Sequence, residues 1–281
     1  MENFERTNIE QKINNSDFLR IANFVEETYG LKIPDFKKYL IQSRLYKRLK
    51  ALGINSYGEY IDYLFAPGNS QEIQNMIDVV TTHKTDFYRE NDHFEFLNDV
   101  ILPEHSKLSN NIDIWSAGCS SGEEPYTLAF TVNEFNDKNI SKLNYRIYGS
   151  DVSLTSIQEA QNAVYSMNKI AGIPLYIKKK YFLKNKDSEK NLVKIIPEIR
   201  KNVHFFKLNF LDKEYNLDKE FDLIMCRNTL IYFSRETQEI VLRKLLKFLK
   251  KGGYLLIGHS ESIFSMNLPV KLVKTTIFKK I

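Results

Sequence analysis

From Ile112 onward the sequence repeats one pattern, in which a short apolar segment is followed by a turn and then by a helix-like segment. The apolar segments are IDIWSA (112–117), YRIYGSD (145–151), VHFFKLNF (203–210), FDLIMCRN (221–228) and YLLIGHS (254–260). Stretches with helical periodicity lie between them, such as GEEPYTLAFTVNEF, LTSIQEAQNAVY and ETQEIVLRKLLKFLK. Strands that alternate with helices form a parallel sheet covered on both faces. We therefore expect an α/β domain whose ligand lies beyond the carboxyl ends of the strands.

The first part of the chain has a different character. Residues 16–80 read as helices, and no strand alternation interrupts them. The segments SDFLRIANFVEETYG and PDFKKYLIQSRLYKRLKALG both end in a glycine, which suits a helix C-terminus. We expect a small all-helical domain in front of the α/β domain.

The second of these helices carries an unusual charge. Between Lys32 and Lys50 there are seven basic residues, at positions 32, 37, 38, 44, 47, 48 and 50, against one acid, Asp35. Lys37, Arg44 and Arg48 fall within a narrow arc at 100° per residue. Such a face either binds an anionic partner or is a solvated helix surface, and composition alone favours the solvated surface.

The composition limits the classes of protein to which the chain can belong. With 43% apolar and 27% charged residues and no run of about 18 apolar residues, the chain is typical of a folded globular protein without a membrane span. The N-terminal segment lacks the apolar region of a secretory signal, so we expect a cytoplasmic protein. Cys119 and Cys226 are far apart, and the five histidines form no HExxH motif. We therefore expect reduced thiols and no metal site.

The turn after the first strand indicates the ligand. Gly118 and Gly122 have the spacing GxxxG rather than the dinucleotide-binding GxGxxG, and Glu123 and Glu124 begin the next helix. Carboxylates at a helix N-terminus are stabilised by the helix dipole but would repel a pyrophosphate. They suit a ligand with an ammonium or sulfonium charge, and S-adenosyl-L-methionine carries both.

Asp151 closes the second strand, where an acidic side chain can accept hydrogen bonds from both ribose hydroxyls of a nucleoside. It can equally cap the helix that begins near Leu154. Residue spacing alone leaves both roles open.

Several segments then resemble a known family, the CheR-type protein-glutamate O-methyltransferases of bacterial chemotaxis. The segments are TTHKTDFYRE (81–90), WSAGCSSGEEPYTLAF (115–130), YGSD (148–151), FKLNFL (206–211), FDLIMCRNTLIYF (221–233) and GGYLLIGHSES (252–262). Their order and spacing agree with the family, and the resemblance covers nearly the whole chain. It implies a helical domain at 1–85 that docks on the receptor and a Rossmann-like methyltransferase domain at 86–281. A small antiparallel β-subdomain is expected as an insertion at about 166–202.

The resemblance also implies an activity and its residues. The enzyme would transfer a methyl group from S-adenosyl-L-methionine to glutamates in the cytoplasmic helices of chemoreceptors, leaving S-adenosyl-L-homocysteine, and would act as a monomer without binding nucleic acid. The positions that match cofactor-binding residues are His83, Thr85, Arg89, Glu123, Glu124, Asp151, Asn209, Phe210, Arg227 and Asn228. Arg89 and Tyr232 match the catalytic positions, and Lys37, Arg44, Lys47 and Arg48 become docking residues.

Three details qualify this assignment. The family more often has Asn where this chain has His83, and a neutral imidazole can still make one hydrogen bond. Either Glu123 or Glu124 can face the ammonium group of the cofactor, and we assign this contact to Glu124. The chain has no glycine between Gly172 and Gly252, so the glycine-rich loop of members that bind a receptor tether is absent, and we expect no tether binding.

The chemistry agrees with this set of residues. A glutamate carboxylate has a pKa of about 4.3 and is already ionised at pH 7, so no general base is needed. We expect Arg89 to align the reacting groups and Tyr232 to donate a hydrogen bond near the methyl group. Two alternatives are a methyltransferase acting on another protein, nucleic acid or a small molecule, and a receptor-binding module without catalysis. The absence of an NPPY-like motif disfavours nucleic acid as the substrate, and the filled cofactor positions disfavour the non-catalytic module.

Overall fold

The computed structural model describes residues 12–281, and these form two units. The helical unit runs to Thr82 and includes the short segment Tyr232–Ser234, whereas the α/β unit comprises His83–Ile231 and Arg235–Ile281. Residues 1–11, on which the expectations about the N-terminus and the start of the helical domain partly depend, lie outside the described residues. Among residues 12–281, none of the helices has the length and hydrophobicity of a transmembrane span.

The helical unit contains the elements α1 (Asn15–Tyr29), η1 (Asp35–Lys37), α2 (Lys38–Leu52), α3 (Tyr57–Phe65) and α4 (Ser70–Val80). The Asn14 side chain caps α1 by accepting a hydrogen bond from the Asp17 N–H at 2.8 Å. Gly30 and Gly53 end α1 and α2 with left-handed backbone, as the sequence predicts. Its core consists of buried side chains from all four α-helices: Ile21, Val25, Leu45, Leu49, Ile61, Leu64 and Ile77.

A seven-stranded sheet forms the centre of the α/β unit, with the strand order β6-β2-β1-β7-β8-β10-β9. The strands are β1 (Asn111–Ala117), β2 (Asn144–Asp151), β6 (Val203–Lys207), β7 (Phe221–Cys226), β8 (Leu249–Ile257), β9 (Val270–Lys274) and β10 (Ile277–Lys280). The first five in spatial order are parallel, and β10 runs antiparallel to β8 and β9. The predicted α/β class with a parallel sheet is confirmed, whereas the antiparallel C-terminal pair was not foreseen.

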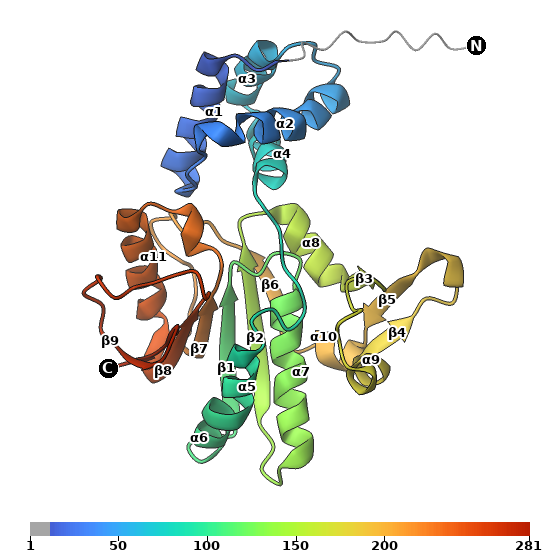
Figure 1. The fold of residues 1–281 in the computed structure, drawn as a ribbon, viewed down its shortest axis with the longest axis vertical. Coiled ribbons are helices and arrows are strands. Elements are labelled where there is room, and N and C mark those ends of the chain that lie inside the picture. The colour runs from blue at the N-terminus through green and yellow to red at the C-terminus, as the bar shows by residue number, and fades with distance from the viewer. Residues whose placement is uncertain (1–11) are drawn as a thin grey trace. The chain divides into compact units, whose positions relative to one another are not determined.

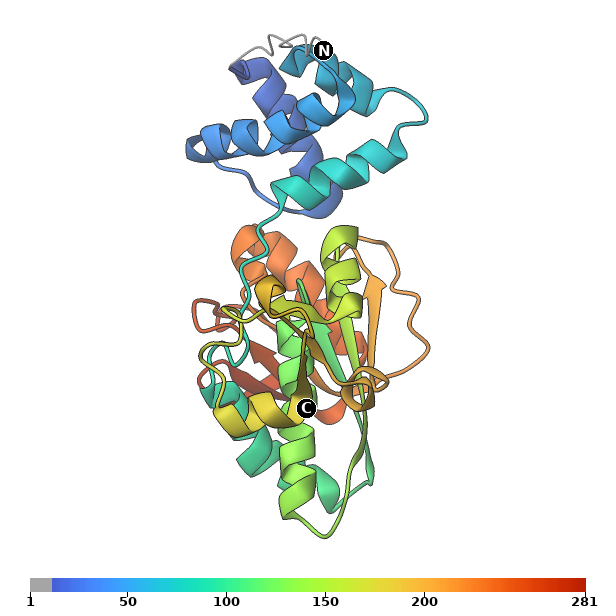
Figure 2. The same ribbon diagram turned by 90° about the vertical axis from the view of Figure 1, so that its right-hand side faces the viewer.

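Helices cover both faces of this sheet (Figures 1 and 2). They are α5 (Asp92–Phe96), η2 (Leu97–Ile101), α6 (Leu102–Ser106), α7 (Glu123–Lys138), α8 (Leu154–Asn162) and α11 (Arg235–Lys247). Ile114 of β1 belongs to the apolar cluster that contains the α7 side chains, including Phe130. The next residue, Trp115, packs against the rings of Phe206, Tyr215, Phe221 and Phe248. Alternate residues of a strand point to opposite faces, so each face of β1 has its own core.

The insertion between α8 and β6 forms a separate three-stranded antiparallel sheet with the order β3-β5-β4, as expected. Its elements are β3 (Val164–Ser166), α9 (Leu175–Tyr181), β4 (Phe182–Lys184), η3 (Ser188–Lys190), β5 (Leu192–Ile195) and α10 (Pro197–Arg200). Tyr181 stacks on Phe130 of α7 with ring centroids 4.7 Å apart. The predicted helix 154–165 was too long, because Ala163 adopts a left-handed backbone (φ 53°) and the chain continues as β3.

Candidate functional site at the carboxyl ends of the strands

The loop after β1 requires a glycine at its first position. Gly118 has φ 85°, and a Cβ there would lie 2.4 Å from Oγ1 of Thr229 in the loop after β7. The Gly118 and Cys119 N–H groups donate to the Ser150 carbonyl of β2 at 2.8 and 2.9 Å. Loops from three neighbouring strands therefore meet at one edge of the sheet, where a parallel α/β fold binds its ligand. Cys119 and Cys226 are both buried and free, as expected.

Asp151 holds this loop in place. Its Oδ2 accepts from the Ser120 N–H at 2.8 Å, and its Oδ1 accepts from the Ser153 N–H at 3.0 Å. The cap of α8 is Ser153, whose hydroxyl accepts from the Ser156 N–H at 3.1 Å, so the alternative role of Asp151 as the helix cap is wrong. Burial raises the pKa of Asp151, although these backbone hydrogen bonds oppose that effect.

The two acids at the start of α7 point to different surroundings. Glu124 accepts from the Ser116 hydroxyl at 2.7 Å and lies 3.3 Å from the Arg227 guanidinium. Glu123 accepts from the Ser121 hydroxyl at 2.8 Å and lies 3.2 Å from the Lys169 ammonium of the inserted subdomain. Burial raises the pKa of both carboxyl groups by more than the charges of Lys169 and Arg227 lower it. A cationic ligand would stabilise them.

Arg227 and Asn228 are held by two acids that the sequence analysis did not single out. Glu90 lies 3.1 Å from the Arg227 guanidinium and accepts from the Asn228 side-chain amide at 2.9 Å. Glu261 accepts from the backbone N–H groups of Asn228 and Gly258 at 3.1 and 2.6 Å. Both acids stand inside quoted motifs, FYRE and GHSES, so an acid of a family motif to which no role had been assigned was the available signal.

Glu90 is ionised at neutral pH. Burial alone would raise its pKa, but the hydrogen bond from Asn228 and the charge of Arg227 lower it below the usual value. A half-buried anion held by an arginine and an amide fixes the orientation of both partners. Arg227 and Asn228 are therefore placed before any ligand arrives.

The segment before Glu90 lies against the same loops. His83 Nδ1 is 3.0 Å from the Ser156 hydroxyl of α8, and the His83 carbonyl accepts from the Ser120 hydroxyl at 3.4 Å. The carbonyl of Thr85 accepts from the Lys169 ammonium at 2.7 Å. Arg89 donates to the Lys84 carbonyl at 2.8 Å. The segment 83–90 thus borders the site on the side of α8 and the subdomain.

The remaining predicted cofactor residues follow β6. The Leu208 N–H donates to the Asp151 carbonyl at 3.0 Å, which brings Asn209 and the buried Phe210 close to the end of β2. Tyr232 ends the single turn η4 (Leu230–Tyr232) and belongs to the helical unit. Its placement beside the methyl group stays a prediction.

Three of the four predicted docking residues, Arg48, Arg44 and Lys37, have partners inside the helical unit. Arg48 donates from Nε and one terminal nitrogen to the two Glu72 carboxylate oxygens at 2.9 and 2.6 Å, and Glu72 is only 4% exposed. Arg44 donates to the carbonyls of Val80 and Thr81 at the end of α4, at 2.5 and 3.0 Å. The half-buried Lys37 places its ammonium 5.6 Å from the centroid of the Tyr232 ring, and Lys47 is exposed.

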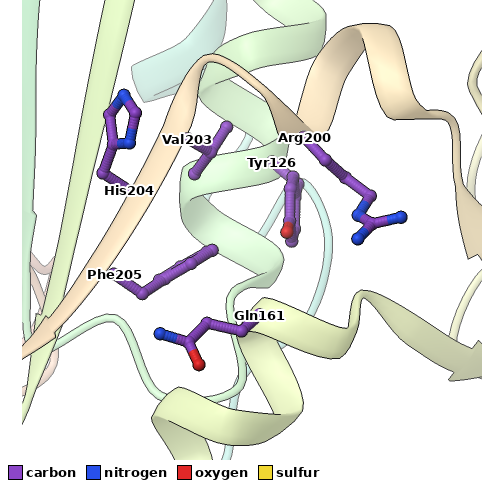
Figure 3. Close-up of a pocket in the computed structure, with 6 residues that line it drawn as sticks. All are labelled: Tyr126, Gln161, Arg200, Val203, His204 and Phe205. Carbon is purple, nitrogen blue, oxygen red and sulfur yellow. The ribbon is translucent and has the colours of Figure 1, made fainter.

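A pocket of about 300 Å³ lies elsewhere on the α/β unit, between β6, α7, α8 and α10 (Figure 3). Its lining residues are Tyr126, Gln161, Arg200, Val203, His204 and Phe205. His204 and Phe205 point to opposite sides of β6 (Figure 3). None of the predicted site residues lines it, so the candidate site remains at the carboxyl ends of the strands.

Comparisons with known proteins match both units. The family model described as "CheR methyltransferase, SAM binding domain" matches residues 83–279, and "CheR methyltransferase, all-alpha domain" matches residues 16–81. A chemotaxis protein methyltransferase of Borreliella burgdorferi is 38% identical over 99% of this chain and 99% of its own length. One from Salmonella typhimurium is 32% identical over 95% of this chain and 90% of its own length. Chemotaxis protein methyltransferase 1 of Pseudomonas aeruginosa is 36% identical over 91% and 92%, respectively.

Proposed function

The chain belongs to the CheR methyltransferase family and is an S-adenosylmethionine-dependent methyltransferase, and on this premise we propose that its acceptors are glutamate side chains of chemoreceptors. The products would be glutamyl methyl esters and S-adenosyl-L-homocysteine. The observation that carries the proposal is the pair of acids at the first turn of α7, the buried Glu123 and the half-buried Glu124, where a phosphate ligand would be repelled.

The donors and acceptors of the site fit this cofactor. Glu124 would bind the ammonium group. Asp151 would accept hydrogen bonds from the ribose hydroxyls through the carboxylate lone pairs that the Ser120 and Ser153 N–H groups do not use. Arg227 and Asn228, held by Glu90, would contact the amino-acid end. The predicted contacts of His83, Thr85, Arg89, Asn209 and Phe210 complete the set.

When bound, the cofactor supplies an electrophilic sulfonium methyl group. The protein's own contribution is positioning: it holds the acceptor carboxylate in line with that group, which can supply roughly 7–11 kcal/mol. No proton has to be removed from an ionised glutamate, so no general base takes part. Arg89 would align the acceptor, and Tyr232 would donate a hydrogen bond near the transferred methyl group. The reaction neutralises the acceptor carboxylate and the sulfonium group. If Arg89 stabilised the charged carboxylate too strongly before transfer, it would slow the reaction.

Docking would use the cationic surface of η1 and α2. Receptor methylation segments are helices that bear several glutamates, so a basic surface complements them. Because Arg44 and Arg48 are bound inside the unit, we assign direct contact mainly to Lys37 and Lys47 and a supporting role to the two arginines. Phe36 and Tyr39, which are 79% and 75% exposed, supply apolar area beside these lysines. The enzyme would work as a monomer at cytoplasmic receptor arrays.

The test is methyl transfer from labelled S-adenosylmethionine to receptor-rich membranes, followed by mild alkali. Glutamyl methyl esters release volatile methanol, whereas N-methyl groups keep the label. Alkali-stable label would show another acceptor class, and S-adenosylhomocysteine binding without transfer would show a non-catalytic receptor-binding module.

Matched variants separate catalysis from docking. Arg89→Ala should abolish most transfer while receptor binding persists. Lys37→Ala with Lys47→Ala should weaken receptor binding, and the remaining binding should lose part of its salt dependence. The control is Lys138→Ala with Lys213→Ala, which removes two exposed lysines of the α/β unit. An equal loss of receptor binding in the two double variants would refute the docking assignment.

A further inference from the structure

Three potential metal ligands meet beside the candidate site. His93 lies in the first turn of α5, Glu90 precedes this helix, and His259 follows β8. Each offers one ligand atom, and these atoms all lie within 4.8 Å of one another. The two imidazole rings contact edge to face, with centroids 4.9 Å apart. We call Glu90, His93 and His259 the Glu–His–His cluster.

The hydrogen bonds of His93 determine which of its ring nitrogens has a free lone pair. Nε2 lies 2.8 Å from the Thr276 hydroxyl, and this hydroxyl donates its only hydrogen to the Thr275 carbonyl at 2.6 Å. Thr276 must therefore accept from His93 Nε2–H. Nδ1 is left with a lone pair, and it is fully buried without a hydrogen-bond partner among the described residues.

That lone pair faces a carboxylate. His93 Nδ1 lies 3.7 Å from a Glu90 carboxylate oxygen. At this distance Nδ1 makes no hydrogen bond to the carboxylate, so the ring hydrogen is on Nε2 and Nδ1 carries only the lone pair. Two acceptors without a hydrogen between them repel each other, and a cation between them removes the repulsion.

His259 is already oriented by an acid. Its Nε2 lies 3.2 Å from an Asp92 carboxylate oxygen. A carboxylate that accepts from one imidazole nitrogen leaves the other nitrogen as the ligand and makes it more basic. Asp92 thus has the place that outer-shell carboxylates take behind metal-bound histidines.

We propose that the Glu–His–His cluster binds a divalent transition metal of the zinc class, with Asp92 supporting His259. Two imidazoles and one carboxylate are ligands that zinc accepts and that magnesium and calcium do not prefer. This departs from the expectation of no metal site, which rested on the missing HExxH motif. The metal would fasten the segment 90–93 to the loop after β8.

One charge opposes this site. Arg227 lies 3.1 Å from Glu90. The carboxylates of Asp92 and of Glu124, the latter 3.3 Å from the same guanidinium, offset it. With three acids and one arginine around the cluster, the local charge still favours a cation.

The experiment uses the full-length protein without an affinity tag and Co²⁺ as the probe. We expect one Co²⁺ per chain, visible as absorption bands of a four- or five-coordinate ion, and displacement by Zn²⁺. His259→Gln should lower the affinity roughly tenfold or more. It is a suitable variant because His259 is 48% exposed and can be changed without opening the core. His93→Gln should do the same, with folding checked by circular dichroism.

The matched control is His204→Gln, which removes an exposed imidazole of β6 outside the cluster and should leave Co²⁺ binding unchanged. Three results would overturn the proposal. They are a titration without saturation, equal affinity in His259→Gln and the parent protein, and a thiolate-to-metal absorption band that places the ion on a cysteine. The test does not involve methyl transfer, so its outcome is independent of the proposed function.

Discussion

Replacing Arg48 by methionine tests whether this arginine belongs to the docking surface or to the core of the helical unit. Its guanidinium donates twice to Glu72, at 2.9 and 2.6 Å. Tyr60 and Asn75 also donate to this carboxylate, at 2.8 and 2.9 Å. Arg48→Met keeps the length of the side chain and removes its charge. Glu72 is then a buried anion with two neutral donors.

The size of the effect follows from burial. Breaking a fully buried ion pair by removing one partner costs about 3–5 kcal/mol. The Arg48 side chain is 22% exposed, so water can reach the site and replace part of the interaction with Glu72. We therefore expect the free energy of unfolding to fall by about 2–3 kcal/mol. Adding Glu72→Leu should recover much of this loss, because no buried charge then remains unpaired.

The chain contains a built-in reporter that separates its two units. Its single tryptophan, Trp115, is buried in β1 of the α/β unit. In urea, Arg48→Met should move the circular-dichroism transition of the helical unit to lower concentration while the Trp115 fluorescence transition stays in place. The control is Lys47→Met, which changes an exposed residue of α2 beside Arg48 and should move neither of the two transitions. An unchanged free energy of unfolding in Arg48→Met would refute the structural assignment.

The same pair predicts a pH dependence. Burial alone would raise the pKa of Glu72, but the hydrogen bonds from Arg48, Asn75 and Tyr60 lower it below the ordinary 4.5. A carboxyl group whose pKa is lower in the folded state contributes stability above the unfolded pKa and loses it as the pH falls through the folded value. The difference between the parent protein and Arg48→Met should therefore narrow below about pH 4.5. A constant difference down to pH 3 would contradict the ion pair as its cause.

Two further predictions concern the α/β unit. Lys169→Ala should lower the affinity for S-adenosylhomocysteine several-fold in calorimetry, because Lys169 connects Glu123 and the Thr85 carbonyl. Lys178→Ala is the control and should leave this affinity unchanged, because the Lys178 ammonium donates to the Ala171 carbonyl within the same subdomain. Equal affinities would show that the subdomain does not position the cofactor segment. Gly252 has φ 78° and open space around a new Cβ, so Gly252→Ala should lower the free energy of unfolding by about 1–2 kcal/mol. Gly122→Ala should lower it by at least about 1 kcal/mol more, because the new Cβ would lie 2.8 Å from the Ala160 Cβ. Similar losses in urea titrations followed by Trp115 would contradict the close approach at Gly122.

Local sequence patterns predicted much of this protein correctly. Apolar segments alternating with helical ones indicated a parallel sheet, and the parallel strands β2, β1, β7 and β8 follow them. The glycines at positions 30 and 53 predicted the ends of two helices, and both adopt left-handed backbone. These features depend on side-chain periodicity and backbone freedom within a few residues, so they can be read from the chain itself.

Whether a charged side chain faces solvent or a partner required the tertiary structure. The sequence predicts one helical arc that carries Lys37, Arg44 and Arg48, whereas in the structure Lys37 lies in η1 and only the two arginines lie in α2. Only the packing of α4 shows that Arg48 meets the buried Glu72. Likewise, adjacent acids at the start of α7 look equivalent in sequence. The structure turns Glu123 toward Lys169 and Glu124 toward Arg227, because successive helix residues point about 100° apart.

The sequence by itself determined the fold class, the family motifs and the acidic character of the site, since each is expressed in short contiguous segments. Only the tertiary structure decided that Glu90 and Glu261 hold Asn228 and that His93 meets His259. It also decided that the last two strands extend the sheet in the antiparallel direction. These contacts join residues far apart in the chain, and their geometry depends on how strands and loops stack in space rather than on any local pattern.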